Sequence, residues 1–121
     1  MNDIAALTER IRRFRDARNW QQFHSPKDLA VAITAEAGEL LQPFVWKSSE
    51  ESWDRAEAKK MEIADEIADV AILLFELADN LELDLGTIMN AKLDRNEVRY
   101  PADKSYGSNL KYNELESQSP S

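Results

Sequence analysis

Four carboxylate side chains stand out because their spacing repeats in two stretches of the chain. Glu36 and Glu39 form a Glu-x-x-Glu pair, and Glu66 and Asp69 form a Glu-x-x-Asp pair. Residues three apart on a helix lie on neighbouring parts of one surface, so each pair would present two carboxylates together. Glu36 also falls on the apolar face of its predicted helix, where a buried residue is expected. These pairs are therefore the first candidates for chemistry.

Carboxylates that meet in one place need a counter-charge. Two like charges about 5 Å apart repel by roughly 3 kcal/mol at an effective dielectric constant of about 20. A ligand set made only of oxygen suits Mg²⁺ or Mn²⁺ rather than zinc, and the single histidine, His24, lies outside both pairs. We expect a site for Mg²⁺ or Mn²⁺. The alternative interpretation is a non-catalytic helical interaction module, in which the acidic pairs are only surface charge.

A basic and polar row follows further along the chain. Lys92, Asn96 and Arg99 recur at steps of four and three, beside an apolar row on the same predicted helix. Such a row can hold phosphate oxygens, with Lys and Arg as charges and Asn as a directional donor. The alternative is a solvated helix face.

Aromatic residues flank the predicted helix that carries Glu36. Trp20 and Phe23 precede it, and Trp46 follows it. Aromatic side chains of this kind can stack on a nucleobase, although they can equally close the end of a helical bundle.

The elements that must position these residues are helices. Apolar spacing predicts four of them, at about residues 3–18, 26–42, 53–80 and 85–98, with residues 47–52 as a polar loop. Ser25 is expected to cap the second helix, with Pro26 at its first position, and Asp84 to cap the fourth. Three arginines of the first helix are expected to face solvent: Arg12, Arg13 and Arg15.

Four amphipathic helices with short connections predict an all-α, antiparallel four-helix bundle. The third helix is longer than its neighbours, and its unmatched apolar surface predicts a homo-oligomer. The 121 residues suffice for one domain, expected over 1–112, with a flexible polar C-terminal tail at 113–121.

Composition limits the remaining function classes. The absence of cysteine excludes thiolate nucleophiles and Cys-ligated metal sites. A net charge of −8 argues against a nucleic-acid polymer as partner. The longest apolar run, Val70–Phe75, is too short to cross a bilayer, and no signal peptide is evident. We therefore expect no membrane partner and a cytoplasmic location.

Taken in order, the motifs resemble the all-α nucleoside triphosphate pyrophosphohydrolases of the MazG type, and within that family the dCTP pyrophosphatase branch. The similarity covers about residues 4–115. It rests on the order and spacing of these motifs: Glu36-x-x-Glu39, Glu66-x-x-Asp69, Lys92-x-x-x-Asn96-x-x-Arg99-Tyr100-Pro101, Trp20-x-x-Phe23-His24-x-Pro26 and Phe44-x-Trp46-Lys47-Ser48.

The resemblance implies Mg²⁺-dependent hydrolysis of a (d)NTP, such as dCTP or a related or modified dNTP, to the monophosphate and pyrophosphate. It also implies a homodimer or homotetramer that removes surplus nucleotides. Glu36, Glu39, Glu66 and Asp69 would be the metal ligands, and Glu36 or Glu39 would act on the attacking water. The implied substrate-binding residues are Trp20, His24, Trp46, Lys47, Lys92, Asn96 and Arg99.

One position departs from the pattern of the animal dCTP enzymes. Leu73 stands where those enzymes have a tyrosine, one turn after the last acidic residue. The base preference is therefore open, and dUTP and phosphoribosyl-ATP remain alternative substrates.

Overall fold

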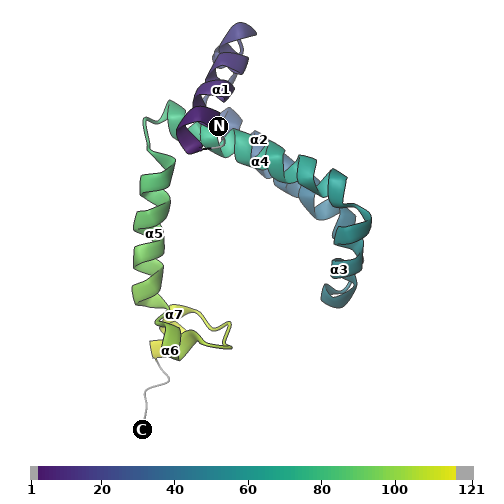
Figure 1. Ribbon diagram of the computed structural model, residues 1–121, viewed down its shortest axis with the longest axis vertical. Helices are drawn as coiled ribbons and strands as arrows, with labels where there is room; N and C mark the ends of the chain where they lie inside the picture. The colour runs from purple at the N-terminus through teal and green to yellow at the C-terminus, as the bar shows by residue number, and fades with distance from the viewer. Residues whose placement is uncertain (1–2, 117–121) are drawn as a thin grey trace. The chain divides into compact units, whose positions relative to one another are not determined.

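The structure is a computed structural model that describes residues 3–116, and within that range it is helical with no strand. The all-α class is thereby confirmed. The elements, shown in Figure 1, are α1 (Ile4–Ala17), η1 (Gln21–Phe23), α2 (Pro26–Leu41), η2 (Gln42–Phe44), α3 (Ser49–Ala58), α4 (Lys60–Asn80), α5 (Leu85–Arg99), α6 (Ala102–Ser105) and α7 (Tyr112–Glu116). The chain divides into two compact units, Met1–Leu83 and Asp84–Ser121. The bundle arrangement and the oligomer stay predictions.

Two helix starts form as their local sequence predicts. The Ser25 hydroxyl accepts a hydrogen bond from the backbone N–H of Asp28 at 3.1 Å, and Pro26 opens α2. The Asp84 carboxylate accepts from the backbone N–H of Thr87 at 2.8 Å and so caps α5. Each cap satisfies a backbone donor that the first helical turn leaves without a partner.

The predicted loop at 47–52 and the single helix at 53–80 are wrong. A separate helix, α3, begins after Ser48, where Ser48 and Glu51 form a reciprocal capping box. The break falls at Lys59, whose backbone (φ −114°, ψ 25°) leaves the α-helical region. Before this break, α3 lies against η2, where the Arg55 Nε donates to the Pro43 carbonyl at 2.8 Å.

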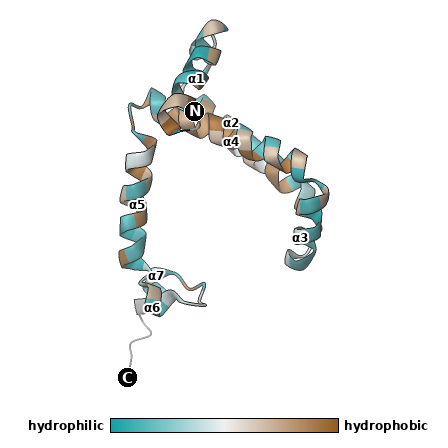
Figure 2. Cartoon of the chain, viewed as in Figure 1, coloured by the Kyte–Doolittle hydropathy of each residue, from teal (hydrophilic) through white to brown (hydrophobic). Residues whose placement is uncertain are grey.

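In the first unit, α2 and α4 lie side by side (Figure 1). They are antiparallel, because residues near the start of α2 meet residues near the end of α4. His24, just before α2, contacts Glu76, whereas Glu36 near the end of α2 contacts Glu66. Hydrophobic residues gather along this pair (Figure 2), with Leu29 fully buried.

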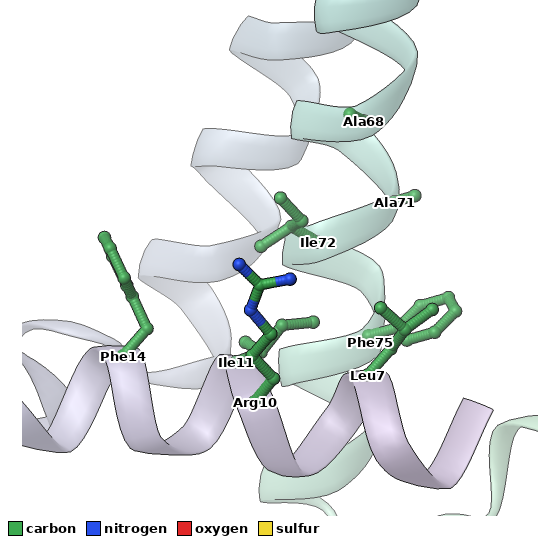
Figure 3. Close-up of a pocket in the computed structure, with 8 residues that line it drawn as sticks. All are labelled: Leu7, Arg10, Ile11, Phe14, Ala68, Ala71, Ile72 and Phe75. Atoms are coloured by element: carbon green, nitrogen blue, oxygen red, sulfur yellow. The ribbon is translucent and has the colours of Figure 1, made fainter. Parts of the chain in front are cut away.

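Helix α1 crosses α4 and is tied to it by an ion pair, in which Arg12 Nη2 lies 2.6 Å from Asp79 Oδ1. Beside the crossing runs an apolar groove of about 500 Å³, called here the α1–α4 groove. Figure 3 shows its lining residues: Leu7, Arg10, Ile11, Phe14, Ala68, Ala71, Ile72 and Phe75.

The apolar stripe predicted along the third helix is only partly covered. Ile67 is 54% exposed and Leu74 is 43% exposed. Phe14 and Ile72, at the α1–α4 groove, are also about half exposed. A single chain therefore leaves much of its apolar helix surface in contact with water, which is costly.

In the second unit, the chain folds back on itself after α5. The ring of Tyr112 in α7 packs edge-on against Tyr100 at 6.2 Å between centroids, and Leu115 is buried. The first residues of the predicted tail thus belong to α7, and its remaining residues, 117–121, lie outside the described part of the chain.

Among the helices of residues 3–116, none combines the length and the apolar character that a bilayer crossing requires.

Candidate metal centre and nucleotide site

Three of the four predicted acidic residues come together in the first unit. Glu36 and Glu39 project from α2 and Glu66 from α4, and one carboxylate oxygen of each lies within 4.8 Å of the others. We call these three residues the acidic cluster. The antiparallel pairing of α2 and α4 brings the two motifs to the same level. Glu36 and Glu66 are half-buried and Glu39 is exposed.

The pKa values of Glu36 and Glu66 in the acidic cluster are both raised. Burial is the main cause that raises the pKa of Glu36, and the negative charges of Glu39 and Asp69 add to it. Burial also raises the pKa of Glu66, followed by the charges of Glu39 and Glu36. Such shifts occur where carboxylates are withdrawn from water and held near other negative charges.

The donor set fits a hard divalent cation. Glu36 Oε2 and Glu66 Oε2 are buried and have no hydrogen-bond partner within the described residues. Buried acceptors without a partner are rare and costly, and a cation between them would satisfy both. Carboxylate oxygens on two rigid helices are the ligands that Mg²⁺ and Mn²⁺ take.

Asp69, the fourth predicted ligand, does not belong to the group of carboxylates whose oxygens all lie within 4.8 Å of one another. Its charge nevertheless contributes to the raised pKa of both Glu36 and Glu66. It lies one turn from Glu66 on α4, so its carboxylate adds to the negative potential of the site.

A cavity of about 350 Å³ adjoins the acidic cluster. Glu39 and Glu66 line it together with two basic residues, Arg55 of α3 and Lys59 at the α3–α4 break. Neither of these two cations was predicted from the sequence. Their four-residue spacing, which places both on one helix face, was the available signal. The cavity therefore combines acidic and basic groups, as a polyphosphate with a bound cation would require.

At the opposite end of the α2–α4 pair lie two predicted base-contacting residues, Trp20 and His24. Their ring centroids are 6.3 Å apart. The ring of His24 is bound to Glu76, which is 4% exposed. Arg15, expected to face solvent, is instead 5% exposed and lies beside the same carboxylate. That expectation was wrong because Arg15 is held by partners from α4, far away in the sequence.

Trp46 and Lys47 lie at the other end of α2, after η2. Trp46 adopts a left-handed backbone conformation (φ 65°) and is 96% exposed. The helix between Ser25 and Trp46 is about 24 Å long at 1.5 Å per residue. One chain therefore does not bring Trp46 next to Trp20 and His24.

The predicted phosphate-binding row lies in the second unit, on α5. Lys92 and Asn96 are one turn apart, with Lys92 exposed and Asn96 half-buried. The guanidinium of Arg99 stacks over the Tyr112 ring at 5.0 Å, so α7 holds this predicted binding residue in place.

Residues 3–116 form an all-helical fold in which carboxylates from two antiparallel helices converge, and such a group could hold a metal ion. A sequence model of the MazG-like family matches residues 31–115, and the chain belongs to that family.

Characterised relatives share the same stretch of sequence. The chain is 41% identical over 104 residues to dCTP pyrophosphatase 1 of Rattus norvegicus and 38% identical over 106 residues to dCTP pyrophosphatase 1 of Homo sapiens. Each match covers 84% of this chain, which spans only 61% of the length of either relative. The crystal structure of a pyrophosphatase from Archaeoglobus fulgidus matches with a TM-score of 0.77 and 42% identity, covering 80% of this chain and 91% of that one.

Proposed function

We propose that this protein is a Mg²⁺-dependent nucleoside triphosphate pyrophosphohydrolase that converts dCTP, or a related or modified dNTP, to the monophosphate and pyrophosphate. The observation that carries the proposal is the acidic cluster, in which two buried carboxylate oxygens have no partner within the described residues. The relatives named for dCTP and pyrophosphatase activity support the choice of reaction.

The proposed reaction adds the oxygen of water to a phosphorus atom and breaks one phosphoanhydride bond. Glu36 or Glu39 orients this water and accepts its proton on a carboxylate oxygen. Mg²⁺, when bound by Glu36, Glu39, Glu66 and Asp69, would polarise the phosphate oxygens and offset their charge. Whether the α or the β phosphorus is attacked is decided by product analysis in ¹⁸O-water.

The phosphates and the base need separate contacts. Lys92, Asn96 and Arg99 are the proposed phosphate-binding residues, and Arg55 and Lys59 are additional cations beside the acidic cluster. Such cations offset the charge on the leaving pyrophosphate.

Trp20 and His24 are proposed to contact the base. Ten residues of α4 separate Glu66 from Glu76, which is about 15 Å along the helix. This is the scale of an extended nucleoside triphosphate, whose base could therefore lie at His24 while its phosphates lie at the acidic cluster.

The proposed active form is a homodimer or homotetramer. The α1–α4 groove and the half-exposed Ile67 and Leu74 form an apolar face that a second copy would cover. A second copy could also supply Trp46 and Lys47 to a base site that they do not reach within their own chain. The proposed setting is the cytoplasmic nucleotide pool.

A substrate panel tests the proposal. Pyrophosphate release is measured for canonical and modified dNTPs, for dUTP and for phosphoribosyl-ATP, with Mg²⁺ and with a chelator. We expect Mg²⁺-dependent release, with dCTP or a modified dNTP among the best substrates. Release from no nucleotide would favour the interaction-module interpretation instead.

A further inference from the structure

A buried ionic network attaches the connection between α1 and α2 to α4. Glu76 and Arg15 are both more than nine-tenths buried. Glu76 Oε1 lies 2.7 Å from His24 Nδ1 and 3.6 Å from Arg15 Nη1. Buried charges are kept in a fold only when they are paired in this way. The metal chemistry proposed above uses neither Glu76 nor Arg15.

The same network also binds the backbone of the connection. The Trp20 N–H donates to the Arg15 carbonyl at 3.1 Å, and Asn80 Nδ2 donates to the His24 carbonyl at 3.4 Å. Arg15 in turn donates to Asn80 Oδ1 at 2.8 Å. Both proposed base-contacting residues, Trp20 and His24, are thus held by groups from α1 and α4.

The contact with Glu76 determines which nitrogen of His24 carries a proton. An ionised carboxylate only accepts hydrogen bonds, so His24 Nδ1 must be the donor. A neutral ring with its proton on Nδ1 presents Nε2 as an acceptor.

His24 Nε2 is available to accept a hydrogen bond from a ligand. It makes no hydrogen bond within residues 3–116, and the His24 side chain is 25% exposed. Phe14 lines the α1–α4 groove and packs edge-on against Trp20 at 5.8 Å, which places an aromatic wall beside His24. An aromatic wall next to a single acceptor suits a planar base that carries an amino group.

The geometry points to Glu76 as a positioning residue for base selection. It fixes the His24 tautomer so that Nε2 accepts a hydrogen bond from the exocyclic amine of cytosine or adenine, and it thereby disfavours uracil and thymine, which present a carbonyl there. This inference rests on the proposed function, because it assigns the base end of the same substrate.

The test compares dCTP with dUTP, which differ at this group. We expect wild-type protein to prefer dCTP in kcat/KM. In Glu76→Ala the preference for dCTP should fall about tenfold, mainly through a higher KM for dCTP. The reason is that one hydrogen bond, from the base to His24 Nε2, distinguishes the two substrates, and the variant no longer holds Nε2 ready to accept it. The kcat for dCTP should change little, since the acidic cluster is distant.

A matched control and a double-mutant cycle separate positioning from general stability. Asp79→Asn breaks the ion pair with Arg12 between the same two helices without touching His24, so its base preference should match wild type. The double variant Glu76→Ala/His24→Ala should be no worse than His24→Ala alone, because both act through one ring. Additive losses would overturn the inference.

Two further measurements keep the inference testable. If Glu76→Ala does not fold, Glu76→Gln replaces it, because an amide can donate as well as accept and no longer fixes the tautomer. If wild type hydrolyses no triphosphate, the proposed function fails, and calorimetry with dCMP and dUMP then tests the inference alone. Equal preference in wild type and the Glu76 variant, in either assay, would contradict it.

Discussion

At the residue scale, Glu36 is a carboxylate in an unfavourable environment. It lies on the inner face of α2, where its burial and the nearby charges of Glu39 and Asp69 raise its pKa. The folded, metal-free protein thus holds a group that would be more stable in water. A carboxylate in this setting weakens the fold unless a cation is bound.

The first prediction concerns Glu36→Gln in the absence of metal. At acid pH the wild-type carboxyl is protonated in both folded and unfolded states, so Tm should differ little. As the pH rises above the ordinary glutamate range, the unfolded chain loses this proton more readily than the folded protein does. Wild-type stability should therefore fall relative to Glu36→Gln, and the variant should have the higher Tm at neutral pH.

The control is the same pair of proteins measured with excess Mg²⁺. A ligand that binds only the folded state raises Tm, so wild type should gain more than Glu36→Gln. A Tm difference that does not change with pH or with Mg²⁺ would show that Glu36 is not part of a charged, metal-binding group.

At this scale the sequence predicted what local spacing can reveal. Glu36 was identified because a charged residue interrupts an apolar face. Arg15 was misjudged because nothing near it in the sequence signals burial. Its partners Glu76 and Asn80 are more than sixty residues away, and only the crossing of α1 and α4 brings them together.

At the scale of the element, α3 depends on its first turn. The Ser48 hydroxyl accepts from the Glu51 N–H, and the Glu51 carboxylate accepts from the Ser48 N–H, both at 3.1 Å. These bonds hold α3 where Arg55 reaches the Pro43 carbonyl. The cap therefore supports the wall of the cavity beside the acidic cluster.

The second prediction is that Ser48→Ala lowers the free energy of unfolding by about 1 kcal/mol, as loss of an N-cap does. Chemical denaturation followed by circular dichroism measures it. Ser52→Ala is the matched control, since the Ser52 hydroxyl donates only to the Ser49 carbonyl within the same helix. An equal effect of both substitutions would contradict the role assigned to the cap.

Helix starts were predictable where a capping residue stands beside an apolar repeat, as at Ser25 and Asp84. The same kind of signal, Ser48-x-x-Glu51, was present at α3 but was interpreted as a polar loop. The break at Lys59 has no proline or glycine to mark it. It follows from the packing of α3 against η2, which a linear pattern does not contain.

At the scale of the molecule, the uncovered apolar face is the basis of the proposed homo-oligomer. The third prediction is that the protein elutes as a dimer or larger in multi-angle light scattering. Ile72→Asp, which places a charge in the α1–α4 groove, should shift it toward monomer. Met61→Asp, at an exposed position of α4 outside the groove, is the control and should leave the oligomer intact. A wild-type monomer would refute the proposed assembly.

The whole-molecule arrangement was the least predictable from sequence. Apolar repeats indicated that helices must pack, and they indicated excess apolar surface on residues such as Ile67 and Leu74. They did not specify which helix covers which face. Apolar residues form both the contacts within one chain and the contacts between copies. The apolar repeat in the sequence therefore does not tell the two kinds of contact apart.

The most direct measurement is pyrophosphate release from dCTP as Mg²⁺ is added, for wild type beside Glu36→Gln and Glu66→Gln. The proposed metal site predicts release that saturates with Mg²⁺ in wild type, stops with a chelator, and falls by about a hundredfold or more in both variants while their helical circular dichroism persists. Variants that keep the wild-type rate and the same Mg²⁺ dependence would show that the acidic cluster does not hold the metal that the reaction uses.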